Sequence, residues 1–106
     1  MKILLDECVP VQVRNAFCDH EVHSATSPPW RGLSNGDLLI RADLDGFDLL
    51  IVADKNMRYQ QKLPVRHLAI LELWTNHRPT LEKEFSYIRA AAERMAPRKY
   101  LQLKAS

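Results

Sequence analysis

A chain of 106 residues is long enough for one domain with its own core and too short for two. Its hydrophobic content of 46% and charged content of 26% are ordinary for a globular protein, and no stretch approaches the ~20 apolar residues of a membrane-spanning helix. No secretory signal follows Met1, and Cys8 and Cys18 fit neither a zinc pattern nor a disulfide framework. These features predict a single cytoplasmic domain over residues 1–106, with no membrane association.

Strands and helices are predicted to alternate along the chain. The first half should contain a strand at 2–6, a helix from Pro10 to about Cys18, a short strand at 21–23 and a proline-rich loop at 27–32. A helix capped by Ser34 and ended by Gly46 should follow, then a strand at 48–53, a helical stretch at 56–62 and a strand at 67–73. A last helix, capped by Thr80 and reaching Met95, should precede an edge strand at 100–103. This order predicts a three-layer α/β/α sandwich with a mainly parallel sheet of four to five strands.

Two of the apolar runs stop at a carboxylate. Ile3-Leu4-Leu5 runs into Asp6 and Glu7, and the run at 49–53 ends at Asp54. Continuous apolar runs are typical of buried parallel strands, and ligands of such sheets bind beyond the carboxyl ends of the strands. Two bare carboxylates ~4 Å apart repel by about 4 kcal/mol at an effective dielectric constant of 20. If the two strands are neighbours, we therefore expect a divalent cation between their terminal acids.

Each of these acids also has a purely structural interpretation. Asp6 could be a solvated strand end, and Asp54 could serve a turn or a helix cap. Asp37 stands three residues after Ser34, where a carboxylate is a routine capping partner, and sequence alone favours that role. Three further acids surround a turn and are expected to be solvated, namely Asp43, Asp45 and Asp48.

Charge is divided unevenly along the chain. Residues 1–54 carry four basic and nine acidic side chains, whereas residues 55–106 carry eleven basic and four acidic ones. An acidic half that holds a cation beside a basic half suits a polyanionic substrate, although halves of a sequence need not be faces of a molecule. The three glycines do not form a phosphate-binding loop, which argues against dinucleotide and nucleoside triphosphate binding.

Four stretches together resemble PIN-like nuclease domains. They are Leu4-Leu5-Asp6-Glu7-Cys8-Val9-Pro10, the stretch from Trp30 to Leu39 that contains Asp37, Asp54-Lys55-Asn56-Met57-Arg58-Tyr59-Gln60-Gln61 and, more faintly, Thr75-Asn76-His77-Arg78. They span most of the chain, and the likeness is to the short, VapC-like branch regarded as toxins of bacterial toxin–antitoxin pairs. The resemblance implies a PIN-like fold and a carboxylate-held Mg²⁺ or Mn²⁺.

Carried over residue by residue, the resemblance implies catalytic and metal-binding roles for Asp6, Asp37 and Asp54, and so reverses the capping interpretation of Asp37. Many PIN-like proteins have a fourth acid near the position of Asn56, and a Ser or Thr where this chain has Val52. Asn56 removes one charge from the site. Glu7, or else Glu72 near the end of the fourth strand, could supply the missing carboxylate, and Glu7 is closer in sequence to Asp6.

The chemistry implied is metal-assisted hydrolysis of RNA phosphodiesters. Phosphate, sugar or base contacts are expected from six residues, namely Asn56, Arg58, Tyr59, Gln60, Lys62 and Arg78. The resemblance also implies a cognate antitoxin protein as partner, and the edge strand at 100–103 could pair two copies into a homodimer.

Three alternatives remain open from the sequence. A receiver-like phosphoacceptor domain shares the paired acids after the first strand and the aspartate after the third, although its hydroxyl and lysine are not well placed here and no closing helix follows. A PIN-like domain with little catalysis could bind an antitoxin or RNA. A housekeeping RNA-processing enzyme could use the same site without being a toxin.

Overall fold

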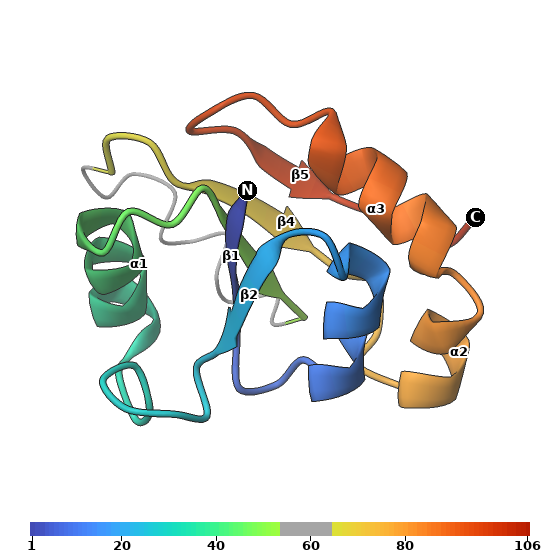
Figure 1. Cartoon of the computed structure of the whole chain (residues 1–106), viewed down its shortest axis with the longest axis horizontal. Coiled ribbons are helices and arrows are strands. Elements are labelled where there is room, and N and C mark those ends of the chain that lie inside the picture. The colour runs from blue at the N-terminus through green and yellow to red at the C-terminus, as the bar shows by residue number, and fades with distance from the viewer. Residues whose placement is uncertain (54–64) are drawn as a thin grey trace.

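In a computed structural model, which describes residues 1–53 and 65–106, five strands form one sheet between two layers of helices (Figure 1). The strands are β1 (Lys2–Leu5), β2 (Glu21–Ser24), β3 (Leu49–Val52), β4 (Ala69–Glu72) and β5 (Tyr100–Gln102). The helical elements are the 3₁₀ helix η1 (Val11–Phe17) and the α-helices α1 (Asn35–Leu44), α2 (Arg78–Glu82) and α3 (Phe85–Glu93). The helical stretch predicted at 56–62 lies outside the described residues.

The sheet is parallel throughout, with the strand order β2-β1-β3-β4-β5. From β1 the chain moves outward to β2 and then crosses back to place β3 on the other side of β1. The direction of winding therefore reverses between β1 and β3, and in doubly wound sheets such a reversal opens a crevice at the carboxyl ends of the two strands. β1 and β3 are neighbours, with Leu5 opposite Ile51, as the sequence predicts.

The predicted α/β/α sandwich is confirmed by how alternate strand residues divide between the two faces. Ile3 and Leu5 belong to a core cluster shared with η1, α2 and α3, whereas Leu4 belongs to a second cluster shared with α1. Figure 1 places α1 on one side of the sheet and η1, α2 and α3 on the other. All four residues of β3 are buried, which is why this central strand is an unbroken apolar run in the sequence.

Two predicted helices are present but differ from the prediction, one in its helix type and one in its continuity. The helix expected from Pro10 to Cys18 is the 3₁₀ helix η1, in which β-branched Val11 and Val13 disfavour an α-helix, although its buried side chains are those expected. The last helix is divided in two at Lys83 and Glu84. Thr80 lies inside α2 and does not cap it, because the helix begins earlier, with His77 at the N-cap.

The acids at the turn between α1 and β3 are held by hydrogen bonds, so the expectation that they are solvated was wrong. Asp43 accepts the backbone N–H groups of three successive residues, namely Arg66, His67 and Leu68, over 2.8, 2.9 and 3.0 Å. Burial raises the pKa of Asp43, but these donors outweigh it and hold the pKa below its usual range. Asp45 accepts from Trp30 Nε1 and Arg41 Nε, and Asp48 accepts from the Lys2 N–H and His67 Nε2. Asp43 thus ties the end of α1 to the segment that leads into β4.

No helix of the described residues is long and apolar enough to cross a membrane.

Candidate functional site

The carboxylate of Asp6 lies at the switch point of the sheet. The residue follows β1 directly, and its backbone N–H donates to the carbonyl of Ile51 on β3 over 2.9 Å. Its side chain is only 8% exposed, and the thiol of Cys8 donates to its Oδ2 over 2.8 Å. Its Oδ1 accepts no hydrogen bond from the described residues. Asp6 is therefore a largely desolvated acid with one oxygen left for a ligand, because burying a carboxylate is costly unless a donor or a cation compensates.

Glu7, the next residue, is exposed and reaches across to the loop before α1. Its Oε1 accepts the backbone N–H of Gly32 over 2.8 Å. Gly32 has a φ of +81°, a conformation that L side chains rarely adopt, so a glycine suits this turn. One oxygen of Glu7 thus orders the stretch that leads to α1.

Asp37 stands in the first turn of α1. Its backbone N–H donates to the Oγ of Ser34 over 3.3 Å, which confirms Ser34 as the N-cap. The carboxylate of Asp37 is exposed and makes no hydrogen bond or ion pair with any described residue. The reciprocal half of a capping box is therefore missing among the described residues, and the capping interpretation does not account for this acid.

Six of the predicted site residues lie outside the described residues. They are Asp54, Asn56, Arg58, Tyr59, Gln60 and Lys62. Only Ala53 separates Asp54 from Val52, the last residue of β3. Arg78, the predicted basic contact beyond β4, begins α2, and its Nε donates to Glu82 Oε1 over 3.0 Å at the surface.

Glu72, the alternative fourth acid, ends β4 and is 2% exposed. Its Oε1 accepts a hydrogen bond from the hydroxyl of Tyr100 on β5. Glu72 on β4 is opposite Val52 on β3, so β3 lies between Glu72 and Asp6. Two strand spacings put the backbones of the two acids about 10 Å apart. Glu72 therefore joins β4 to β5, whereas Glu7 directly adjoins Asp6.

The donor chemistry of this edge fits a hard divalent cation, but the described residues do not complete a site. Carboxylate oxygens are the ligands that Mg²⁺ and Mn²⁺ prefer. Within residues 1–53 and 65–106, however, no three His, Cys, Asp or Glu side chains are arranged to hold a metal ion. Asp6, Glu7 and Asp37 are thus not a metal site by themselves, and the predicted centre depends on Asp54.

Cys8 is the neighbour of the site that sequence reasoning missed. It was considered only as a possible zinc ligand or disulfide partner, whereas its thiol is a donor to Asp6. The available signal was its position two residues after Asp6. Both residues belong to one turn, which the Val9 N–H closes by donating to the Asp6 carbonyl over 3.0 Å.

Fold and site together define a doubly wound α/β domain with an acidic switch point. No protein-family model, curated protein or solved structure matches the chain.

Proposed function

We propose that this chain is a metal-dependent ribonuclease of PIN-like type that hydrolyses RNA phosphodiesters, and that it is the toxin of a toxin–antitoxin pair in the cytoplasm. The observation that carries the proposal is the buried carboxylate of Asp6 at the β1–β3 switch point. It is supported by the carboxylate of Asp37, which pairs with none of the described residues, and by the place of Asp54 in the sequence, two residues beyond β3. The toxin role, and RNA as the substrate in preference to DNA, rest on the resemblance in sequence.

In this proposal Asp6, Glu7, Asp37 and Asp54 hold Mg²⁺ or Mn²⁺. When bound, such a cation supplies a more acidic water and offsets the negative charge that develops on phosphorus during hydrolysis. Asp6 offers Oδ1 while Cys8 orients the carboxylate through Oδ2. Glu7 keeps the loop before α1 in place through Gly32, and thereby positions the helix turn that bears Asp37.

The chain's own cations are proposed to bind the substrate. Arg58 and Lys62 hold phosphates on either side of the scissile bond, while Asn56, Tyr59 and Gln60 contact sugar or base. Arg78 can join them only by exchanging its contact with Glu82 for a phosphate, which is a small cost because exposed ion pairs contribute little. The cognate antitoxin is proposed to cover the edge of the sheet that bears Asp6, Glu7 and Asp37, or to place a cation there.

The test is a calorimetric titration with Mn²⁺ of the native chain, Asp6→Asn, Asp37→Asn and Asp54→Asn, followed by incubation of each with a structured RNA. Saturable binding that the three substitutions weaken, with cleavage that EDTA stops, is the expected result. Glu21→Gln is the control, because Glu21 is an exposed acid at the amino end of β2, away from the proposed metal site. The Glu21→Gln protein should bind Mn²⁺ as the native chain does.

Two results would contradict parts of the proposal. Binding without cleavage of any RNA would leave a PIN-like binding module for an antitoxin or RNA. An absence of Mn²⁺ binding in the native chain would reject the metal centre.

A second candidate, a receiver-like phosphoacceptor, is favoured by one observation. The strand order β2-β1-β3-β4-β5 is the doubly wound order of receiver domains, in which the acceptor aspartate follows the third strand. Incubation with acetyl phosphate and Mg²⁺ separates the two: a gain of one phosphoryl group that Asp54→Asn abolishes supports the receiver, and an unchanged mass supports the nuclease.

A further inference from the structure

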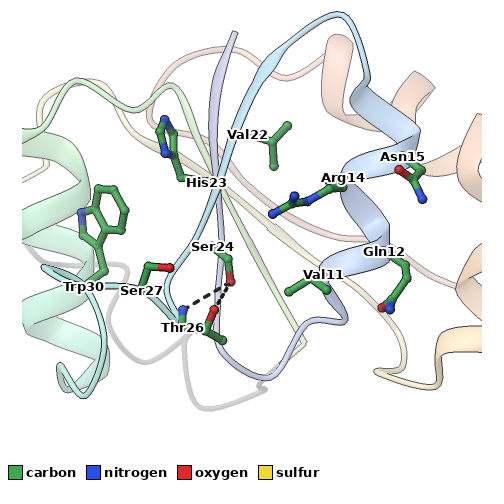
Figure 2. A pocket seen from close by; sticks show the side chains of 10 residues that line it. All are labelled: Val11, Gln12, Arg14, Asn15, Val22, His23, Ser24, Thr26, Ser27 and Trp30. Carbon is green, nitrogen blue, oxygen red and sulfur yellow. Dashed lines mark hydrogen bonds between the residues drawn. The ribbon is translucent and has the colours of Figure 1, made fainter.

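A cavity of about 380 Å³ lies along the outer edge of β2, and none of Asp6, Glu7 and Asp37 is among the residues that line it (Figure 2). We call it the β2 groove; its walls include Val11 and Arg14 of η1, Val22 and Ser24 of β2, and Thr26 and Trp30 of the following loop. Its volume falls in the range of ~300–1,000 Å³ that ligand sites occupy. Figure 2 shows the Arg14 side chain extending from η1 toward β2.

The backbone of β2 presents unpaired hydrogen-bonding groups to this groove. The N–H groups of Glu21 and Ala25 donate inward, to Met1 and Leu5. Alternate residues of a parallel strand bond to the same neighbour, so Val22 and Ser24 direct their N–H groups away from β1. Among the described residues, the Val22 N–H and C=O and the Ser24 N–H have no hydrogen-bond partner. An N–H and a C=O free on one edge are what an added strand requires.

The wall facing this edge carries the positive charge of Arg14, which has no ion-pair partner among residues 1–53 and 65–106. Arg14 is exposed and makes no ion pair with any described residue, whereas Arg41, Arg78 and Arg89 each pair with carboxylates. An occupant that runs along β2 under Arg14 would gain from a negative side chain at that point.

The aromatic wall of the groove favours a peptide over a nucleic acid. Trp30 donates its Nε1–H to Asp45 over 2.9 Å, and its ring packs against His23 and Phe47 at centroid distances of 5.6 and 5.4 Å. Trp30 is therefore a packing residue and not an open platform for a base.

From these contacts we infer that the β2 groove binds an extended acidic peptide segment of a partner protein, which adds to the sheet as a sixth strand beside β2 with a carboxylate facing Arg14. This peptide site does not include Asp6, Glu7 or Asp37, and the inference does not rest on the proposed nuclease activity.

The test follows the amide resonances of Val22 and Ser24 in ¹⁵N-labelled protein during titration with a hexapeptide of alternating valine and glutamate. Both resonances should shift, and both amides should exchange more slowly with solvent. The same peptide with lysine in place of glutamate should bind about threefold to tenfold more weakly, and an N-methylated acidic peptide should not bind.

Two variants locate the site, and two more serve as controls. Val22→Pro removes only an outward N–H, which an edge strand tolerates, and should abolish binding in a chain that remains folded. Arg14→Glu should reverse the preference between the acidic and lysine peptides. Arg94→Glu is the matched control, an exposed arginine outside the groove whose reversal should leave both affinities unchanged. Asp6→Asn should bind the acidic peptide as the native chain does, which keeps failure here distinct from failure of the metal centre.

Three results would overturn the inference. The first is an absence of shifts at Val22 and Ser24 with roughly 1 mM acidic peptide, a concentration that would reveal even millimolar binding. The second is slower exchange of the two amides that grows with protein concentration alone, since a second copy would then occupy the edge. The third is a larger Arg14-dependent shift with polyuridylate RNA than with the acidic peptide.

Discussion

The thiol of Cys8 donates to Oδ2 of Asp6 over 2.8 Å, within a single turn at the carboxyl end of β1. Two residues only two positions apart in the sequence thus provide both the buried acid and the group that orients it. A carboxylate this poorly solvated needs such a donor, because leaving a buried charged group without a hydrogen bond costs more free energy than leaving a buried neutral group without one.

We predict that Cys8→Ala lowers the free energy of unfolding by about 1–3 kcal/mol, because Asp6 loses its donor. Cys8→Ser, which keeps a donor, should lose less. Urea denaturation of the three proteins measures the difference. If alanine and serine are equivalent, the hydrogen bond to Asp6 contributes nothing to stability and only the packing of the sulfur matters.

A second prediction compares two acids on the same helix, Asp43 and Asp37. Asp43→Ala leaves three backbone N–H groups without their acceptor and should cost about 2–3 kcal/mol of unfolding free energy. Asp37→Ala loses only its interaction with the helix dipole and should cost about 0.3–1 kcal/mol. Chemical denaturation measures both, and an equal or larger cost at Asp37 would mean that its carboxylate has a structural role.

The carboxylate of Asp43 also predicts that the stability of the fold depends on pH. The pKa of Asp43 lies below its usual range in the folded chain, so the contribution of Asp43 is fully present above pH ~4, near the unfolded pKa. It is lost as the pH falls through the lower, folded pKa. The difference in unfolding free energy between the native chain and Asp43→Asn should therefore be constant at neutral pH and shrink in acid.

Other acids titrate in the same range and need a control. Arg89 donates to both carboxylate oxygens of Asp19 and lowers its pKa to about 2. Asp19→Asn should leave the acid-dependent difference at Asp43 unchanged, because the two sites share no hydrogen bond. A difference that stays constant from pH 7 to pH 2 would show that the pKa of Asp43 is the same in the folded and the unfolded chain.

A fourth prediction concerns the homodimer expected at the other edge of the sheet. β5 is an edge strand, as predicted, and its bonds to β4 use Lys99 and Leu103, so Tyr100 and Gln102 direct their backbone groups outward. If two copies pair along β5, light scattering at micromolar concentration should give twice the chain mass, and Gln102→Pro should give a monomer. A native monomer would reject this pairing.

The central strands β1, β3 and β4 could be predicted because they are buried on both faces. β3 is one apolar run, and the acids that follow the first and third apolar runs in the sequence predict a switch point without reference to distant contacts. The interruption of the last helix could not be predicted in this way. Leu81, Ile88 and Ala92 are all buried as expected, but their spacing fits one helix as well as two.

The misjudged acids have a different cause. Asp43 is near a turn, and a turn acid is usually solvated, yet it binds residues 23 to 25 positions further along the chain. No local pattern encodes that contact. The same holds for Glu72, whose buried carboxylate depends on Tyr100 from another strand. Long-range acceptors of this kind depend on tertiary structure, which periodicity does not report.

The all-parallel sheet also governs when the candidate site can form. Within residues 1–53 and 65–106 it contains no hairpin: each ladder between these residues joins segments about twenty to fifty residues apart, as in Lys2 with Glu21 and Ile3 with Leu49. The entropy of closing loops of that size is lost before contacts between the strands stabilise the chain, so folding should be slower than in a helical domain of equal length. During synthesis Asp6 is made about forty residues before β3, and it stays solvated until β3 has emerged and docked beside it. A nascent chain that stops short of β3 therefore has the acid but no switch point.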